Sequence, residues 1–183
     1  GVSELAYQFI GGILGHAKPI SAVVAPTVNS YKRLVRQGSM SGSTWAPVFC
    51  CYGNNNRTNM LRIPSAGARV ECRAPDIACN PYLGAAMLLA AGLEGIEQSI
   101  DPGLPHRENM YNYSDKEIDD AGIECLPRNL SEATDAIADD ALAYSVLGAD
   151  MHKAFIDFKR SEWDSYHNTI SEWEMQRYLR QFG

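Results

Sequence analysis

Arg69-Val70-Glu71-Cys72-Arg73 is a five-residue segment in which charged and apolar residues alternate. Because successive side chains of a strand point to opposite faces, Arg69, Glu71 and Arg73 are predicted to share one face of a strand. Two interpretations of that face are possible. It is either a salt-bridged surface strand, or an anion pocket in which Glu71 binds a divalent cation, since oxygen ligands suit Mg²⁺ or Mn²⁺.

The segments on either side predict a sheet followed by helices. Two more strands are expected at residues 46–52 and 58–63, with the turn signal Gly53-Asn54-Asn55-Asn56 between them. Apolar spacing and capping residues predict helices at about residues 3–17, 81–99, 131–147, 151–167 and from residue 171 onwards. Lys18-Pro19 is expected to end the first helix, and residues 104–128 are expected to form an irregular connector. We therefore predict an α+β fold, an antiparallel sheet backed by helices.

Charge divides the chain into two parts. Residues 1–80 carry eight Lys and Arg against three acidic residues, a net charge of +5, whereas residues 81–183 carry eight against nineteen, a net charge of −11. This asymmetry predicts that the first part binds an anion. Dense basic clusters with interleaved aromatic residues, which nucleic-acid binders show, are missing, so small phosphates or carboxylates are the expected ligands. We expect one domain, with the sheet and an arginine-rich site in residues 1–100 and an acidic helical section in residues 101–183.

Several classes of protein are excluded by composition. The chain has 183 residues, of which 45% are hydrophobic and 21% are charged, as is usual for a globular protein. No apolar run reaches the roughly 20 residues of a membrane span, and no signal peptide opens the sequence. Five cysteines without a CxxC pair predict reduced, mostly buried thiols in a cytoplasmic protein. His16 is expected to be packed or partnered on its helix, not catalytic.

Several segments resemble the glutamine synthetase family in order and spacing. They are Pro26-Thr27-Val28-Asn29-Ser30-Tyr31-Lys32-Arg33-Leu34, Asn56-Arg57-Thr58, Arg62-Ile63-Pro64, Arg69-Val70-Glu71-Cys72-Arg73-Ala74-Pro75-Asp76 and Asn80-Pro81-Tyr82-Leu83. The resemblance continues through residues 90–96 to Trp173-Glu174, and thus covers essentially the whole chain. It implies the C-terminal part of a glutamine synthetase/guanido-kinase-like catalytic domain. It also implies an ATP-dependent ligase that uses Mg²⁺ or Mn²⁺ and forms a γ-glutamyl amide through γ-glutamyl phosphate.

The resemblance assigns a role to each matching residue. Arg33 and Arg73 match arginines that hold glutamate and its acyl phosphate, and Glu71 matches a metal ligand. Arg57 matches an arginine on the transferring phosphate, while Arg57 and Arg62 match arginines near the nucleotide. Arg69 matches a further arginine on the nucleotide side. Cations around a moving phosphate are what phosphoryl transfer requires of a protein.

The loop that precedes Ala46-Pro47 departs from the pattern of the ammonia-using members. Those members carry a glutamate immediately before Ala-Pro, whereas this chain has Trp45 after a Gly/Ser-rich stretch that we expect to be mobile, residues 37–44. An aromatic residue there favours a substituted amine; the alternative is that Trp45 packs, and that another group of the loop replaces the glutamate or the activity is lost. The Trp-Ala-Pro loop and the terminal segments resemble the branch that contains γ-glutamylmethylamide synthetases. The implied acceptor is therefore ammonia or, alternatively, an alkylamine.

Further expectations concern the whole protein. The first residue is not Met, and the other metal ligands and the small amino-terminal domain of the family have no counterpart here, so we expect the chain to be inactive by itself. The intact protein is expected to be a homo-oligomer of the family's double-ring type. A non-catalytic scaffold or sensor is a further alternative. Tyr111 lies where some bacterial members carry an adenylylated tyrosine, but its flanking residues differ, and we predict an unmodified loop tyrosine.

Overall fold

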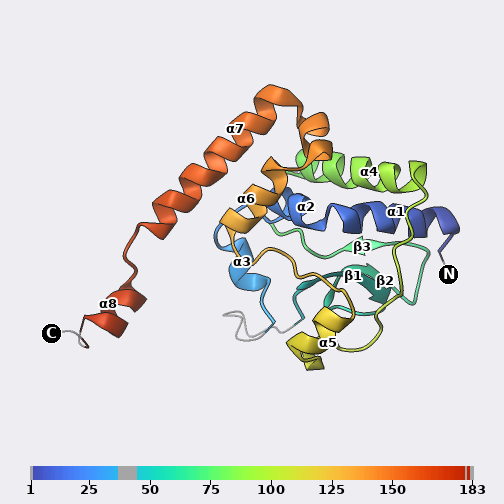
Figure 1. The fold of residues 1–183 in the computed structure, drawn as a ribbon, viewed down its shortest axis with the longest axis horizontal. Coiled ribbons are helices and arrows are strands. Elements are labelled where there is room, and N and C mark those ends of the chain that lie inside the picture. Colours follow the sequence, from blue (N-terminus) through green and yellow to red (C-terminus); the bar gives the residue numbers. More distant parts are fainter. Residues whose placement is uncertain (1, 37–44, 180, 182–183) are drawn as a thin grey trace.

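The protein is described here by a computed structural model that covers residues 2–36, 45–179 and 181. The predicted loop at residues 37–44 lies outside the described residues. The elements, shown in Figure 1, are α1 (Glu4–Gly15), α2 (Ala17–Val24), α3 (Ser30–Arg33), β1 (Phe49–Asn54), β2 (Asn59–Ile63), β3 (Glu71–Cys72), α4 (Pro81–Glu97), the 3₁₀ helix η1 (Met110–Asn112), α5 (Asp115–Asp120), α6 (Leu130–Ala138), α7 (Ala141–His167) and α8 (Glu172–Tyr178).

The sheet is mixed, with the strand order β1-β2-β3. β2 and β3 are antiparallel as predicted, with Arg62 opposite Glu71. The predicted antiparallel pairing is wrong for β1 and β2, which run parallel with Tyr52 opposite Leu61. The residues between these strands cross back along the sheet instead of forming a tight hairpin, because the buried Asn56 side chain is bound to backbone far away in the sequence, at His106 and Glu108.

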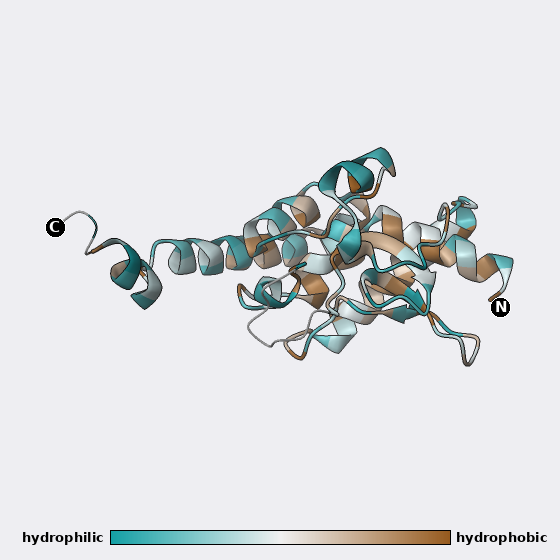
Figure 2. Ribbon diagram, turned by 90° about the horizontal axis from the view of Figure 1, so that it is seen from below, coloured by the Kyte–Doolittle hydropathy of each residue, from teal (hydrophilic) through white to brown (hydrophobic). Residues whose placement is uncertain are grey.

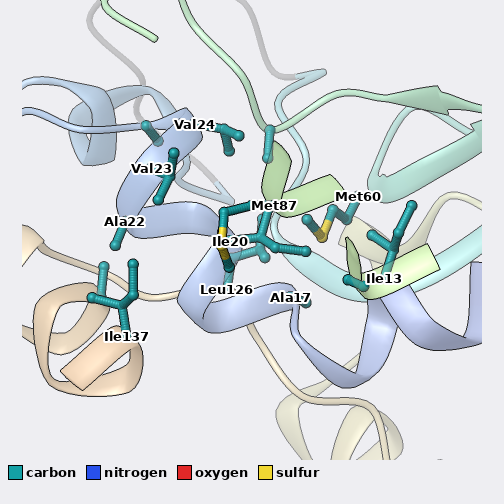
Figure 3. Packing of buried hydrophobic residues seen from close by; sticks show 14 of the residues in the cluster. Ile13, Ala17, Ile20, Ala22, Val23, Val24, Met60, Met87, Leu126 and Ile137 are labelled. Carbon is teal, nitrogen blue, oxygen red and sulfur yellow. The ribbon is translucent and has the colours of Figure 1, made fainter. Parts of the chain in front are cut away.

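The helices cover the sheet and enclose the main core. α1 and α4 lie side by side, and α2 packs against both α4 and α6 (Figure 1). Figure 3 shows Ile20 and Met87 meeting at the centre of this core, with Ile137 contributed by α6. Apolar burial of this kind is the main stabilising contribution to a fold. The core therefore fixes the sheet that carries the arginines.

α1 and α4 approach so closely that their backbones touch. A Cβ added at Gly12 would lie 1.9 Å from the carbonyl oxygen of Ala91 and 2.7 Å from the amide nitrogen of Gly95. A Cβ at Gly95 would lie 2.2 Å from the carbonyl oxygen of Gln8. Only glycine fits at these two positions, since backbone atoms cannot move aside as a flexible side chain can.

The boundaries of the first helices are set by local signals. Ser3 caps α1 as predicted, since its hydroxyl accepts a hydrogen bond from the amide of Ala6. α1 ends at Gly15, two residues before the predicted end, and Lys18-Pro19 does not end it: Pro19 lies in the first turn of α2, where a missing amide proton costs nothing. α4 starts at Pro81 as predicted, behind the cap residue Asn80.

Residues 104–128, predicted to be an irregular connector, contain η1 and α5. The helix predicted at residues 131–147 is wrong. Its N-cap is Asn129, α6 ends at Ala138, and Asp140 caps the separate helix α7. The predicted break between the helices at residues 131–147 and 151–167 is present, because Gly148 has a non-helical backbone with a φ of 74° and α7 is kinked there.

The end of α7 and α8 form an arm that extends away from the body (Figure 1). Figure 2 shows that hydrophobic residues are concentrated in the body, while the arm is largely hydrophilic. In the part of the chain that the structure describes, no helix combines the length and the apolarity needed to cross a membrane. The five cysteines are free thiols, but the expectation that they are mostly buried is wrong, because Cys51 is buried, Cys50, Cys72 and Cys79 are partly exposed, and Cys125 is exposed.

Candidate active site

Glu71 lies between two arginines. Its carboxylate accepts a hydrogen bond from Arg62 Nη1 at 2.8 Å, across the β2–β3 pair, and two from Arg69 at 2.8 and 3.0 Å. The bonds from Arg62 and then from Arg69 lower the pKa of Glu71 below its usual range. Of the two interpretations of this strand, a salt-bridged surface or an anion pocket, the structure therefore shows the salt bridges at Glu71.

Arg73 lies just beyond β3 and bonds to the main chain of two other predicted site residues. Its Nη1 donates to the carbonyl oxygen of Trp45 at 3.1 Å and to that of Arg57. Burial lowers the pKa of Arg73, and the positive charges of Arg57, Arg62 and Arg33 lower it further. Two carboxylates, Glu71 and Asp76, do not balance the five guanidinium groups of Arg33, Arg57, Arg62, Arg69 and Arg73, and this part of the molecule therefore attracts anions.

A cavity of about 450 Å³ collects several of these groups. Of the predicted residues, Trp45, Arg57 and Arg62 line it; its other lining residues are Asn55, Asn56, Arg107 and Asn109. The Arg57 side chain is exposed, and the Trp45 side chain is 47% exposed. A larger cavity, of about 900 Å³, lies between α5 and residues 123–128, but no predicted site residue lines it.

Arg33 binds the backbone that follows β3, next to the cavity. Its guanidinium donates to the carbonyl oxygens of Arg73, Ala74 and Pro75, at 3.4 Å and 3.3 Å for the first and last. Its buried Nε has no hydrogen-bond partner among the described residues. Burial lowers the pKa of Arg33, against the opposing charge of Asp76. Arg33 thus holds the chain that follows β3, and with it the position of Arg73.

Sequence reasoning missed the residues that close the cavity on its other side. Asn56 Nδ2 donates to the carbonyl oxygens of His106 at 2.9 Å and Glu108 at 2.7 Å, and Asn59 Nδ2 donates to that of His106 at 2.9 Å. These bonds bring Arg107 and Asn109 to the cavity from a segment predicted to be irregular. The available signal was the run Asn54-Asn55-Asn56, which predicts a turn and, through Asn56-Arg57-Thr58, supports the family resemblance, but does not reveal the partner of Asn56.

Neither the histidines nor Tyr111 form a separate centre. His16 is partnered as predicted, between Glu94 and Asp140. Tyr111 belongs to η1 and is half-buried, and its hydroxyl donates to the carbonyl oxygen of Ala46.

The described residues do not make up a complete metal site. No three His, Cys, Asp or Glu side chains among residues 2–36, 45–179 and 181 are grouped so that they could hold an ion. Mg²⁺ prefers six oxygen ligands, whereas Glu71 supplies one carboxylate whose two oxygens are both bound by arginines. Glu71 fits as one ligand of a divalent cation, but not as its whole site.

Comparisons with known proteins show the family of this chain. The family model described as "Glutamine synthetase, catalytic domain" matches residues 1–178. The glutamate–methylamine ligase of Methyloversatilis universalis is 46% identical over 181 residues, which are 99% of this chain and 40% of that protein. The glutamine synthetase of Halobacterium salinarum is 43% identical over 184 residues, 99% of this chain and 39% of that protein.

Solved structures with a similar fold come from the same family. A structure described as "GmaS/ADP complex-Conformation 1" has a TM-score of 0.85 and 46% identity, over 98% of this chain and 40% of its own. The chain spans about 40% of the length of these relatives. A match of this extent identifies the chain as a member of the glutamine synthetase catalytic domain family.

Proposed function

We propose that this chain carries the arginine-rich part of the active site of an ATP-dependent ligase that joins glutamate to ammonia or a small amine. One observation carries the proposal. Arg57 and Arg62 line a cavity of about 450 Å³, Arg73 bonds to the backbone of two of its lining residues, Trp45 and Arg57, and Glu71 pairs with Arg62. A ligase with this chemistry must neutralise phosphate and carboxylate groups, and guanidinium groups bind both.

The reaction has two steps. The side-chain carboxylate of glutamate attacks the γ-phosphorus of ATP, and the bond to ADP breaks. The nitrogen of the amine then attacks the acyl carbon, loses a proton and displaces inorganic phosphate, which leaves a γ-glutamyl amide. Negative charge accumulates on the transferring phosphate in the first step and on the acyl oxygen and leaving phosphate in the second. Fixed cations at these points lower both barriers.

Each arginine has a place in this scheme. Arg57, which is exposed in the cavity, binds the transferring phosphate, and Arg62 and Arg69 lie on the nucleotide side. Arg73 binds the glutamate and its acyl phosphate, and Arg33 holds Arg73 by bonding to the backbone at residues 73–75.

Glu71 contributes one oxygen ligand to the Mg²⁺ or Mn²⁺ ion that accompanies ATP in this proposal. Arg62 and Arg69 hold the carboxylate in place before the ion and the nucleotide bind. The remaining ligands are not among the residues described here.

The acceptor has two candidates, ammonia and an alkylamine such as methylamine. The position of Trp45 favours the alkylamine, because this residue lines the cavity and is 47% exposed. An aromatic face attracts an alkylammonium ion and makes apolar contact with its methyl group. The 46% identity to a glutamate–methylamine ligase supports the same choice.

The test is to assay the full-length protein that contains this chain. With ATP, Mg²⁺ and glutamate, we expect ADP release that depends on an added amine, with a higher kcat/KM for methylamine than for ammonium. A higher kcat/KM for ammonium would be consistent with the ligase activity, but would make ammonia the acceptor instead of an alkylamine. No ADP release with any amine would instead favour a non-catalytic scaffold or sensor. A cytoplasmic location and a double-ring homo-oligomer are further parts of the proposal, the second testable by light scattering.

A further inference from the structure

The backbone at Trp45 and Ala46 is fixed by two side chains from different parts of the chain. Arg73 Nη1 donates to the carbonyl oxygen of Trp45 at 3.1 Å, and the Tyr111 hydroxyl donates to that of Ala46. Two consecutive carbonyl groups are thus held. The direction in which the Trp45 side chain leaves the backbone depends on both bonds.

Tyr111 is itself held on several sides. Arg36 donates to its carbonyl oxygen from Nη2 at 3.1 Å and from Nε at 3.3 Å, and its amide donates to Asn109 Oδ1 at 3.1 Å. Its ring lies against that of Phe49, with 6.4 Å between the centroids. Its hydroxyl therefore has a well-defined position and does not follow the backbone of Trp45.

The anchor of Tyr111 is fixed in turn. Arg36 pairs with Asp115 at the start of α5, at 2.8 Å, and its guanidinium lies 5.9 Å from the centre of the Phe49 ring. Residues 106–109, immediately before η1, are tied to the sheet by Asn56 and Asn59. The segment from residue 106 to Asp115 is therefore tied to the sheet and to Arg36, and two of its residues, Arg107 and Asn109, line the cavity.

We propose that Tyr111 is a positioning residue for the amine acceptor, acting through the Ala46 carbonyl to place the Trp45 indole in the cavity. This inference rests on the proposed function and makes it more specific. The Tyr111 hydroxyl does not touch the substrate, and Tyr111 affects only the binding of the amine. Burial raises the pKa of Tyr111, so its hydroxyl keeps the proton that it donates.

The effect on kinetics is measured in the full-length protein with Tyr111→Phe, which removes only the hydroxyl. One neutral hydrogen bond contributes about 1 kcal/mol, which corresponds to a change of about fivefold. We expect the KM for methylamine to rise about fivefold, with the KM values for ATP and glutamate within twofold of the unaltered protein. The control is Tyr113→Phe. Tyr113 packs in the same apolar cluster, and its hydroxyl makes no hydrogen bond to the described residues.

A spectroscopic measurement tests the position of Trp45 without relying on activity. The chain has three tryptophans, and Trp163→Phe with Trp173→Phe leaves Trp45 as the only one. In this background, Tyr111→Phe is expected to increase acrylamide quenching of Trp45 and to shift its emission to longer wavelength, whereas Tyr113→Phe leaves both unchanged. Unchanged Trp45 fluorescence in Tyr111→Phe overturns the proposal, whatever the kinetics show.

The two experiments separate this inference from the proposed function. If Trp45 fluorescence changes but the KM for methylamine does not, the role in amine binding is overturned. If the full-length protein forms no amide with any amine, the proposed function fails together with the amine role of Tyr111. If amide forms and fluorescence does not respond, only the inference about Tyr111 fails.

Discussion

Among the arginines of the cavity, Arg57 is the one whose substitution is expected to affect activity without affecting stability. Its side chain is exposed, lines the cavity, and makes no ion pair with the described residues. Arg57→Ala is expected to lower kcat of the full-length protein by about 100-fold or more, as when a charge-stabilising donor is removed from an active site. The Tm should change by no more than about 2 °C, because exposed unpaired residues contribute little to stability.

Two further variants give the Arg57 prediction its controls. Arg57→Lys keeps the charge but loses the planar fork, and should recover only part of the activity. Arg128→Ala removes another exposed arginine, which lies outside the cavity and pairs with Glu132 at 3.4 Å. We expect full activity from that variant. If Arg57→Ala keeps more than about a tenth of the activity, the phosphate role of Arg57 in the transition state is excluded.

At the scale of helices, His16 connects three elements. It lies between α1 and α2, with Nδ1 2.7 Å from Asp140 at the start of α7 and Nε2 2.5 Å from Glu94 on α4. The hydrogen bond to Asp140 raises the pKa of His16; burial opposes this shift, and the bond to Glu94 adds to it. Lys18, Glu124 and Asp139 line the cavity beside this group, and Lys18 pairs with Glu124 at 3.1 Å.

The raised pKa of His16 predicts a stability that depends on pH. The contribution of a group whose pKa is higher in the folded state is complete below its unfolded pKa, about 6.5, and is lost as pH rises through the folded value. We therefore expect the Tm to fall as pH increases above about 6.5. His16→Asn should lower the Tm by about 4 °C near pH 6, and by less near pH 9.

Thermal unfolding followed by circular dichroism across this pH range measures the effect of His16. His167→Asn serves as a control, because His167 lies at the exposed end of α7. If His16→Asn retains the pH dependence of the unaltered protein, another group is responsible for it. The pKa of Asp140 is lowered by the hydrogen bond from His16, in spite of burial, so loss of stability in acid through Asp140 begins only below about pH 4.

The contact between α1 and α4 gives a second prediction at this scale. Gly12→Ala would place a Cβ 1.9 Å from the Ala91 carbonyl oxygen, and the two helices would have to separate. We expect the free energy of unfolding to fall by about 2–3 kcal/mol, a loss of about 6 °C in Tm. Gly15→Ala is the matched control, since nothing lies within 4 Å of a Cβ there. It should stabilise α1 slightly, because alanine favours a helix over glycine.

The elements differ in how far they could be predicted from sequence. α4 was predicted to within two residues because its signals, the cap Asn80 and Pro81 at the first position, are local. The parallel pairing of β1 with β2 was missed because it depends on contacts between Asn56 and residues about 50 positions away. A short polar run with a glycine is typical of a hairpin, and no local pattern reveals such a partner.

In the candidate site, too, some features could be predicted from the sequence and others could not. The residue types of the arginine cluster and their common position in the fold could be predicted from the family resemblance. Which guanidinium faces the cavity could not, because Arg33 is occupied by backbone carbonyls and Glu71 by two arginines only in three dimensions. Arg107 and Tyr111 were missed as parts of the cavity and its support for the same reason.

At the scale of the whole molecule, the charge distribution and the residues of the site give two predictions for residues 1–183 alone. This chain should bind an anion, and it should not catalyse amide formation. Residues 1–80 carry a net charge of +5 and supply most of the cavity, but the described residues group no three side chains that could hold a metal ion, and Glu71 is the carboxylate paired with Arg62 of the cavity. We expect calorimetry to detect binding of tripolyphosphate, which weakens when salt is added because exposed charges are screened. Arg57→Ala with Arg62→Ala should weaken it strongly, whereas Arg128→Ala should not. With ATP, Mg²⁺, glutamate and methylamine, the same chain should form no amide. Amide formation by residues 1–183 would contradict this prediction, because it would require a complete metal site that the described residues do not provide.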